Sequence, residues 1–122
     1  GQVGKGMPHP RFYGTFPRIL HHYVRERAAL PLPLAIHKMT GATARALKLK
    51  DRGLLKAGYR ADVAIFDPAD FRDRATYADP HQFPSGARTT VIVNGAPVVE
   101  DARHTDALPG QVLRRDERGA VG

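Results

Sequence analysis

Apolar residues along this chain follow two spacings, one helical in the first part and one strand-like in the second. In the first part they recur at intervals of three and four residues, at Ile19, Leu20, Tyr23 and Val24. Pro17 suits a first helical turn, and Thr15 just before it suits an N-cap. Helical spacing resumes after Pro33, and Thr40 is placed to cap a third short helix that runs to residue 47.

From residue 54 onward the pattern favours strands, and we expect residues 51–113 to be mainly strands. Residues 63–66 form a continuous apolar run between two aspartates, which predicts a strand covered on both faces. Asn94-Gly95 between two apolar runs predicts a type I′ hairpin. If Val93 pairs with Ala96, then Ile92 lies opposite Pro97, whose missing N–H would have pointed away from that partner. We therefore place the second strand of the hairpin at a sheet edge.

Charge and composition exclude several classes of partner. The net charge of +7 would suit a nucleic-acid ligand, but the basic residues are spread among acidic ones. No recognition helix, zinc finger or aromatic-basic RNA motif accompanies them, so we expect no nucleic-acid partner. No apolar run approaches the roughly 20 residues that span a bilayer, so we expect a cytoplasmic protein without a membrane partner. The absence of cysteine excludes disulfide and thiolate chemistry within this segment.

The sharpest candidate for chemistry is an arginine in a loop that proline and glycine brace. Arg11 lies in His-Pro-Arg at residues 9–11, and we predict that this loop lies immediately ahead of the first helix. A guanidinium presents a planar fork of donors that matches a carboxylate bidentately, which lysine cannot reproduce. The neighbouring His9 either lines a pocket or braces the turn. By contrast, His21 and His22 are adjacent on a helix, point to different sides of it and are interpreted as structural.

The run at residues 9–18 resembles the segment that follows the metal-site aspartate in N-acyl-D-amino-acid deacylases. These form the D-aminoacylase family of the zinc-dependent amidohydrolase superfamily. Further motifs of this chain resemble motifs that follow in the same order in the family, at residues 38–40, 49–58, 61–67, 79–86, 91–95 and 109–114. The resemblance therefore covers nearly the whole chain, and includes the Gly-x-x-x-x-Gly-x-x-Ala-Asp pattern of residues 53–62, which many amidohydrolases share.

The resemblance implies an α/β parent enzyme that uses zinc to hydrolyse N-acyl-D-amino acids to a D-amino acid and a carboxylate. Residues 1–50 would be the C-terminal end of a TIM-like (β/α)₈ barrel, containing the substrate loop and helices. Residues 51–122 would be the C-terminal part of a small β-sandwich, with a tail. Arg11 would bind the α-carboxylate of the N-acyl-D-amino acid, and His9 would line the pocket.

The same resemblance places no catalytic residue and no metal ligand in this chain. The family's zinc ligands lie on earlier barrel strands, and its catalytic aspartate lies in a Ser-Asp-Gly turn of which Gly1 would be the glycine. We therefore expect a C-terminal fragment whose partner is the N-terminal part of the same enzyme. On its own it should bind no zinc tightly and hydrolyse nothing. Two alternatives stay open at this point: a non-catalytic complementing fragment, and a sister cyclic amidohydrolase of the dihydropyrimidinase or dihydroorotase kind.

Overall fold

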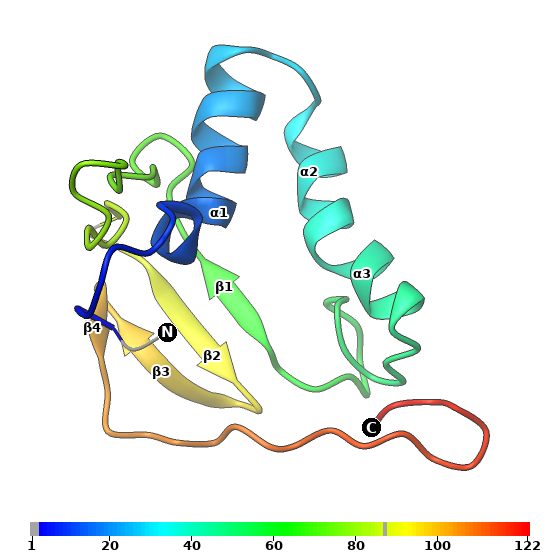
Figure 1. The fold of residues 1–122 in the computed structure, drawn as a ribbon. Coiled ribbons are helices and arrows are strands. Elements are labelled where there is room, and N and C mark those ends of the chain that lie inside the picture. Colours follow the sequence, from blue (N-terminus) through cyan, green and yellow to red (C-terminus); the bar gives the residue numbers. More distant parts are fainter. Residues whose placement is uncertain (1–2, 87) are drawn as a thin grey trace. The chain divides into compact units, whose positions relative to one another are not determined.

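The computed structural model describes residues 3–86 and 88–122, in which helices come first and strands later (Figure 1). This order agrees with the sequence prediction. The contacts divide the chain into two compact units. One comprises Gly1–Ala35 and Phe66–Ala87, and the other comprises Ile36–Ile65 and Arg88–Gly122. Gly1, which was compared with the glycine of a family turn, lies outside the described residues.

The first unit begins its helical part earlier than the sequence predicted. Helix α1 spans Arg11–Arg18 and continues into a π-helical segment, η1, over Ile19–Glu26. Pro17 thus lies inside the helix, and Arg11 is the first helical residue rather than part of a preceding loop. Thr15 is not an N-cap, because its hydroxyl donates to the Arg11 carbonyl at 2.6 Å. Pro17 has no N–H for the carbonyl four residues earlier, and the wider helix follows directly after it.

Two further helices follow, α2 over Leu32–Met39 and α3 over Gly41–Ala46. The predicted third helix is therefore present, and Thr40 occupies its N-cap position. Its hydroxyl makes no capping bond, because it donates to the Ile36 carbonyl at 2.7 Å instead. The N–H of Ala44 bonds to the backbone carbonyl of Thr40 at 2.9 Å. The cap position was thus predicted correctly, although its chemistry is backbone rather than side chain.

The second unit contains an antiparallel sheet with strands in the order β1-β2-β3-β4 (Figure 1). The strands span Val63–Ile65, Thr90–Val93, Ala96–Glu100 and Arg103–His104. The predicted hairpin is confirmed in its register, since Val93 pairs with Ala96 and Ile92 pairs with Pro97. Asn94 and Gly95 both have positive φ, at 49° and 85°, as a type I′ turn requires.

The second strand of that hairpin is not at the sheet edge, contrary to the prediction. Strand β4 pairs with β3 on its outer side, through Val99 with His104 and Glu100 with Arg103. The chain reverses there at Asp101 and Ala102, whose φ angles are 47° and 60°. Positive φ at an alanine is unfavourable, so the residue types at this turn gave no hairpin signal.

Two other strand predictions need correction. Strand β1 exists, but it is not covered on both faces, because Ala64 and Ile65 are exposed and Val63 is half-buried. It is the first strand of the sheet and has a partner on one side, β2. Residues 51–113 are also not mainly strands, since the described residues outside these short strands are turns and irregular segments. Strand-like composition there reflects exposed apolar loop residues such as Leu55, which is 85% exposed.

A polar cluster ties the glycine-containing segment of residues 53–62 to the hairpin turn. Arg52 donates to the carboxylate of Asp62 and, at 2.6 Å, to the side-chain oxygen of Asn94. The backbone N–H of Asn94 donates to Asp62 Oδ1 at 2.8 Å. Partial burial raises the pKa of Asp62, but the hydrogen bonds from Asn94 and Arg52 and the charge of Arg52 outweigh burial, so the net pKa is lowered.

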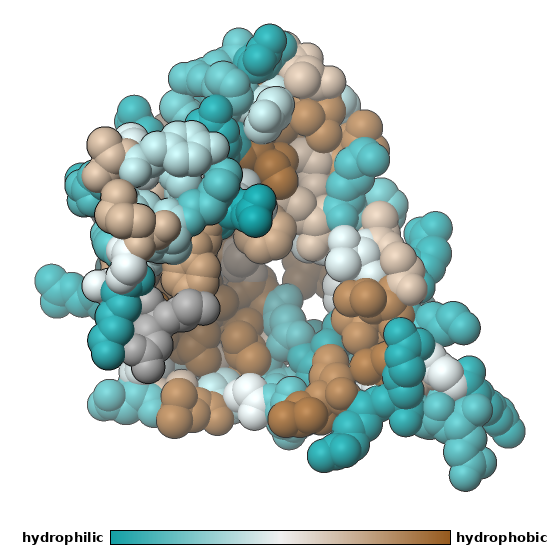
Figure 2. Space-filling view, in the orientation of Figure 1, coloured by the Kyte–Doolittle hydropathy of each residue, from teal (hydrophilic) through white to brown (hydrophobic). Residues whose placement is uncertain are grey.

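Few side chains are buried in the described residues. Leu20, Ala35 and Ala44 are the buried apolar residues, and no large side chain among the described residues is fully buried. Many apolar side chains reach the surface, and Figure 2 shows them interspersed among hydrophilic residues. No helix in the described part of the chain combines the length and the apolar character needed to cross a membrane.

Candidate functional site

The predicted substrate residue Arg11 lies at the start of α1, where backbone N–H groups have no helical partner. His9 supplies one: its Nδ1 accepts the Arg11 N–H at 3.1 Å, and its carbonyl accepts the Phe12 N–H at 2.9 Å. The carbonyl of Pro10 accepts the N–H of Gly14 at 3.1 Å. His9 therefore caps the first turn of the helix that carries Arg11.

The other ring nitrogen of His9 reaches a distant part of the chain. Nε2 lies 3.0 Å from the hydroxyl of Tyr77, and the two rings meet edge to face at 5.1 Å between centroids. Because Nδ1 accepts an N–H, the proton of the neutral imidazole is on Nε2, which then donates to Tyr77. The same histidine thus both braces the turn and faces Tyr77.

A pocket of about 360 Å³ opens beside this turn, wholly within the first unit. It lies between the start of α1 and the loop that contains residues 73–77. Its lining residues are His9, Pro10, Arg11, Gly14, Thr15, Arg18, Asp73, Ala75, Thr76 and Tyr77. Both residues singled out from the sequence, His9 and Arg11, therefore line one pocket.

The two arginines of the pocket differ in their partners. Arg18 donates to Asp73 at 3.1 Å, and this hydrogen bond raises the pKa of Arg18 above its ordinary value. Asp73 is well covered, with its side chain 12% exposed. For the guanidinium of Arg11, residues 3–86 and 88–122 provide no hydrogen-bond or ion-pair partner. The charged lining of two arginines and one aspartate therefore retains one uncompensated positive charge, on Arg11.

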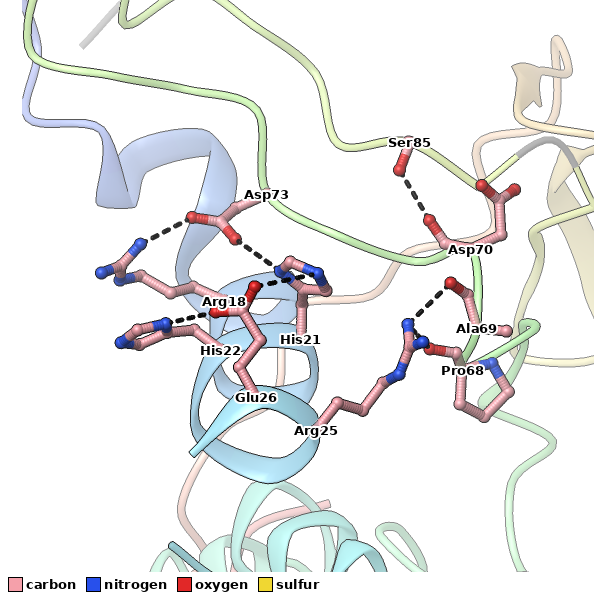
Figure 3. A network of polar contacts seen from close by, with 10 residues as sticks. All are labelled: Arg18, His21, His22, Arg25, Glu26, Pro68, Ala69, Asp70, Asp73 and Ser85. Carbon is pink, nitrogen blue, oxygen red and sulfur yellow. Dashed lines mark hydrogen bonds and ion pairs between the residues drawn. The ribbon is translucent and has the colours of Figure 1, made fainter. Parts of the chain in front are cut away.

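Asp73 also belongs to a wider polar network along η1 (Figure 3). His21 Nδ1 lies 4.0 Å from Asp73, and His21 Nε2 lies 3.6 Å from Glu26. His22 Nδ1 bonds to the same Glu26 at 2.7 Å, and that hydrogen bond lowers the pKa of the Glu26 carboxyl. The two adjacent histidines thus pair with carboxylates.

Arg25, also on η1, donates to the carbonyls of Pro68 and Ala69 at 3.0 and 2.6 Å (Figure 3).

Asp73 and Tyr77 are pocket residues that sequence reasoning missed. Each is more than fifty residues from its partner, at separations of 55 and 68, so local patterns carried no signal for them.

No metal site is formed by the residues described. Within residues 3–86 and 88–122 no group of three His, Asp or Glu side chains could hold a metal ion. In Figure 3, Asp73, His21, Glu26 and His22 are instead joined in a chain of contacts, since His21 meets both Asp73 and Glu26 and His22 meets Glu26. The arrangement at the start of α1 is suited to anion binding, because an exposed arginine without an acidic partner lines a pocket.

Comparisons with known proteins identify the family of the chain. The profile of the amidohydrolase family matches residues 2–99. Three proteins of Alcaligenes xylosoxydans xylosoxydans are similar: a D-aminoacylase, 48% identical over 88% of this chain, an N-acyl-D-aspartate deacylase, 48% identical over 87%, and an N-acyl-D-glutamate deacylase, 45% identical over 95%. The chain belongs to the amidohydrolase family.

Solved structures show the same likeness. A D-aminoacylase crystal structure matches with a TM-score of 0.79 and 46% identity, over 83% of this chain and 21% of that one. An N-acyl-D-glutamate deacylase from Bordetella bronchiseptica, solved with zinc and a phosphonate mimic of the tetrahedral intermediate, matches with a TM-score of 0.71 and 43% identity, over 75% and 19%. The chain spans 21–23% of the length of the three curated relatives.

Proposed function

We propose that the protein to which this chain belongs is a zinc-dependent hydrolase of N-acyl-D-amino acids, with Arg11 as the residue that binds the substrate α-carboxylate. The similarity to three deacylases of N-acyl-D-amino acids supports the reaction. The observation that carries the assignment of Arg11 is its guanidinium, which is exposed, lines the pocket and has no acidic partner among the described residues.

The two arginines of the pocket would meet a substrate carboxylate differently. A carboxylate entering it meets one arginine already satisfied by Asp73 and one that still has its donors available. Arg11 can form the bidentate pair that a planar carboxylate accepts, and the charge of the substrate then balances that of the pocket. Binding at this point would hold the acyl amide in one orientation, which is how a positioning contact accelerates hydrolysis.

The proposal includes the place of the chain in the whole fold. Residues 1–50 would complete a TIM-like barrel, and residues 51–122 would contribute to a small β-sandwich. Packing against further parts of such an enzyme would cover the large apolar side chains that this chain exposes. Zinc, which would activate water and polarise the acyl carbonyl, would be held by other parts of the enzyme, since the described residues do not fit a metal. That the isolated chain is inactive and binds no zinc stays a prediction.

The test uses the whole enzyme and two substrates, an N-acyl-D-amino acid and the matching N-acyl amine that lacks the carboxylate. Arg11→Ala should lower kcat/KM for the first at least about tenfold, because a charged hydrogen bond contributes about 1.5–3 kcal/mol. Arg11→Lys keeps the charge and loses the fork, so it should lie between the wild type and the alanine variant.

The matched control is Arg27→Ala. Arg27 is exposed and lies in the same unit, and its guanidinium has no partner among the described residues. It should leave both activities unchanged. Equal losses on the two substrates in Arg11→Ala, together with a lower melting temperature, would assign Arg11 a structural role. Preferential hydrolysis of a cyclic dihydropyrimidine would overturn the reaction class.

A further inference from the structure

Two histidine–tyrosine hydrogen bonds join the start of α1 to one loop. In one of them the histidine belongs to the start of α1, and in the other it belongs to the loop. His9 bonds to Tyr77 at 3.0 Å, and Tyr13 bonds to His81 at 2.9 Å. In each pair a histidine meets a tyrosine 68 residues away. Both pairs also contact edge to face, with ring centroids 5.1 and 5.6 Å apart.

The loop that provides Tyr77 and His81 is itself closed. The Thr76 N–H donates to the Asp79 carbonyl, and the Asp79 N–H donates to the Thr76 hydroxyl, each at 3.0 Å. The side chain of Gln82 donates to Asp79 at 2.6 Å. These bonds hold residues 76–82 as one turn, so its two aromatic groups are presented together rather than independently.

The two hydrogen bonds differ in what they hold. His81 accepts from Tyr13 at Nδ1 and donates from Nε2 to the Gly6 carbonyl at 2.8 Å, which anchors the segment before the helix. The Tyr13 ring also meets Phe83 edge to face at 5.2 Å. His9, held by Tyr77, accepts the backbone N–H of Arg11 itself. One pair therefore fixes the helix to the loop, and the other acts directly on the residue that carries the guanidinium.

We propose that residues 76–82 form a clamp whose Tyr77 and His81 are positioning residues for Arg11, acting through His9 and Tyr13. The clamp sets the direction in which the Arg11 side chain leaves the first turn of α1, and so the place of a bound carboxylate. This effect on catalysis rests on the proposed function. The mechanical link from Tyr77 to the Arg11 N–H does not depend on it.

The experiment removes only hydroxyl groups, in the whole enzyme, with Tyr77→Phe, Tyr13→Phe and the double variant. Tyr77→Phe deletes the hydrogen bond to His9, and Tyr13→Phe deletes both the bond to His81 and the one that the Tyr13 hydroxyl accepts from the Gly4 N–H. Both changes keep the ring, so kcat/KM for the N-acyl-D-amino acid should fall about two- to tenfold in each variant. Because the two histidine–tyrosine bonds join the same two segments, either one still holds the loop when the other is lost. The loss in the double variant should therefore exceed the product of the single losses. Hydrolysis of the N-acyl amine, which has no carboxylate for Arg11 to bind, should fall less than hydrolysis of the N-acyl-D-amino acid.

Hydrogen exchange of the backbone amide of Arg11 gives a readout that needs no substrate. It should become faster in Tyr77→Phe and faster still in the double variant. His9→Asn can still accept the Arg11 N–H in an Asx turn but cannot make the same bond to Tyr77, so it should match Tyr77→Phe in activity. The control is Tyr59→Phe, whose hydroxyl has no hydrogen-bond partner among the described residues and whose ring faces Lys56.

The outcomes separate the two proposals. If Arg11→Ala affects both substrates equally while amide exchange still responds to Tyr77→Phe, the proposed function is wrong and the clamp stands. If Arg11→Ala acts only on the carboxylate substrate while the tyrosine variants leave amide exchange and kcat/KM at wild-type values, the clamp is wrong and the proposed function stands. Losses in Tyr59→Phe as large as those in Tyr77→Phe would also overturn the clamp.

Discussion

Two arginines of this chain, Arg11 and Arg52, show opposite uses of the same side chain. Arg52 is 11% exposed and is held by the carboxylate of Asp62 and the amide oxygen of Asn94. Arg11 is exposed at a pocket, and its guanidinium has no partner in the described residues. One joins a loop to a hairpin turn, whereas the other leaves its donors available. The presence or absence of partners, rather than residue type, separates a structural arginine from a candidate binding arginine.

The backbones around the two arginines also differ. Arg52 precedes Gly53, whose φ of 83° and close neighbours admit no side chain, so the segment is fixed by packing as well as by charge. Arg11 begins a helix whose first turn is fixed by a histidine side chain. Substitutions near Arg52 should therefore act on stability, and substitutions near Arg11 should act on binding.

The largest effect is expected at Gly53. A Cβ there would lie 2.5 Å from the Ala44 Cβ and 3.2 Å from the Thr40 carbonyl oxygen. Gly53→Ala should therefore destabilise the enzyme in two ways. Steric overlap costs about 1–3 kcal/mol, and a left-handed backbone at a residue with a Cβ costs about 1–2 kcal/mol. Gly58→Ala is the matched control, since Gly58 has the same φ of 83° and nothing within 4 Å of the added atom. Melting temperatures of the whole enzyme should rank wild type above Gly58→Ala and Gly58→Ala above Gly53→Ala. Equal melting temperatures for the two variants would refute the packing argument.

A smaller but more selective effect is expected when the two arginines are changed in the same way. Arg52→Met leaves Asp62 and Asn94 without their main donor and should destabilise the enzyme by about 1–3 kcal/mol, while KM at a permissive temperature stays near the wild-type value. Arg11→Met should do the reverse, raising KM with little change in melting temperature. Thermal denaturation and steady-state kinetics on both variants check this. Identical profiles would remove the distinction between the two arginines.

His9 and Arg11, the two candidate residues that the sequence singled out, do line one pocket, but the sequence did not predict the geometry that holds them. His-Pro-Arg pointed to Arg11, and the pocket contains it together with His9. The start of α1 was misplaced because Pro10 and Pro17 are both compatible with a first helical turn, and local sequence cannot choose between them. The choice agrees with tertiary contacts: His9 caps the Arg11 N–H, and a Cβ on Gly14 would lie 3.0 Å from that of Asp73.

Local sequence also decides which turns of the sheet could be predicted. The turn at Asn94 could be predicted because its residue types match the required φ angles, and the alternation then fixed the register with Pro97. The turn at Asp101 and Ala102 could not, because alanine does not favour positive φ. The clamp residues Tyr77 and His81 were missed because their partners are distant in sequence, and pairing at that range follows from the folded structure alone.

The smallest expected effect is a pH dependence that separates Asp62 from an ordinary surface acid. Asp62 has a lowered pKa, so its contribution to stability is fully present above the ordinary carboxyl pKa and is lost as the pH falls through the lowered value. Asp62→Asn should therefore lower the melting temperature at pH 7, and the difference from wild type should shrink as the pH is lowered below 4. Asp106→Asn is the control, because the carboxylate of Asp106 is exposed and has no partner in the described residues. A difference for Asp62→Asn that stays constant down to acidic pH would show that the Arg52 cluster depends on shape and neutral hydrogen bonds. The ion pair between Arg52 and Asp62 would then not be the feature that distinguishes Arg52 from Arg11.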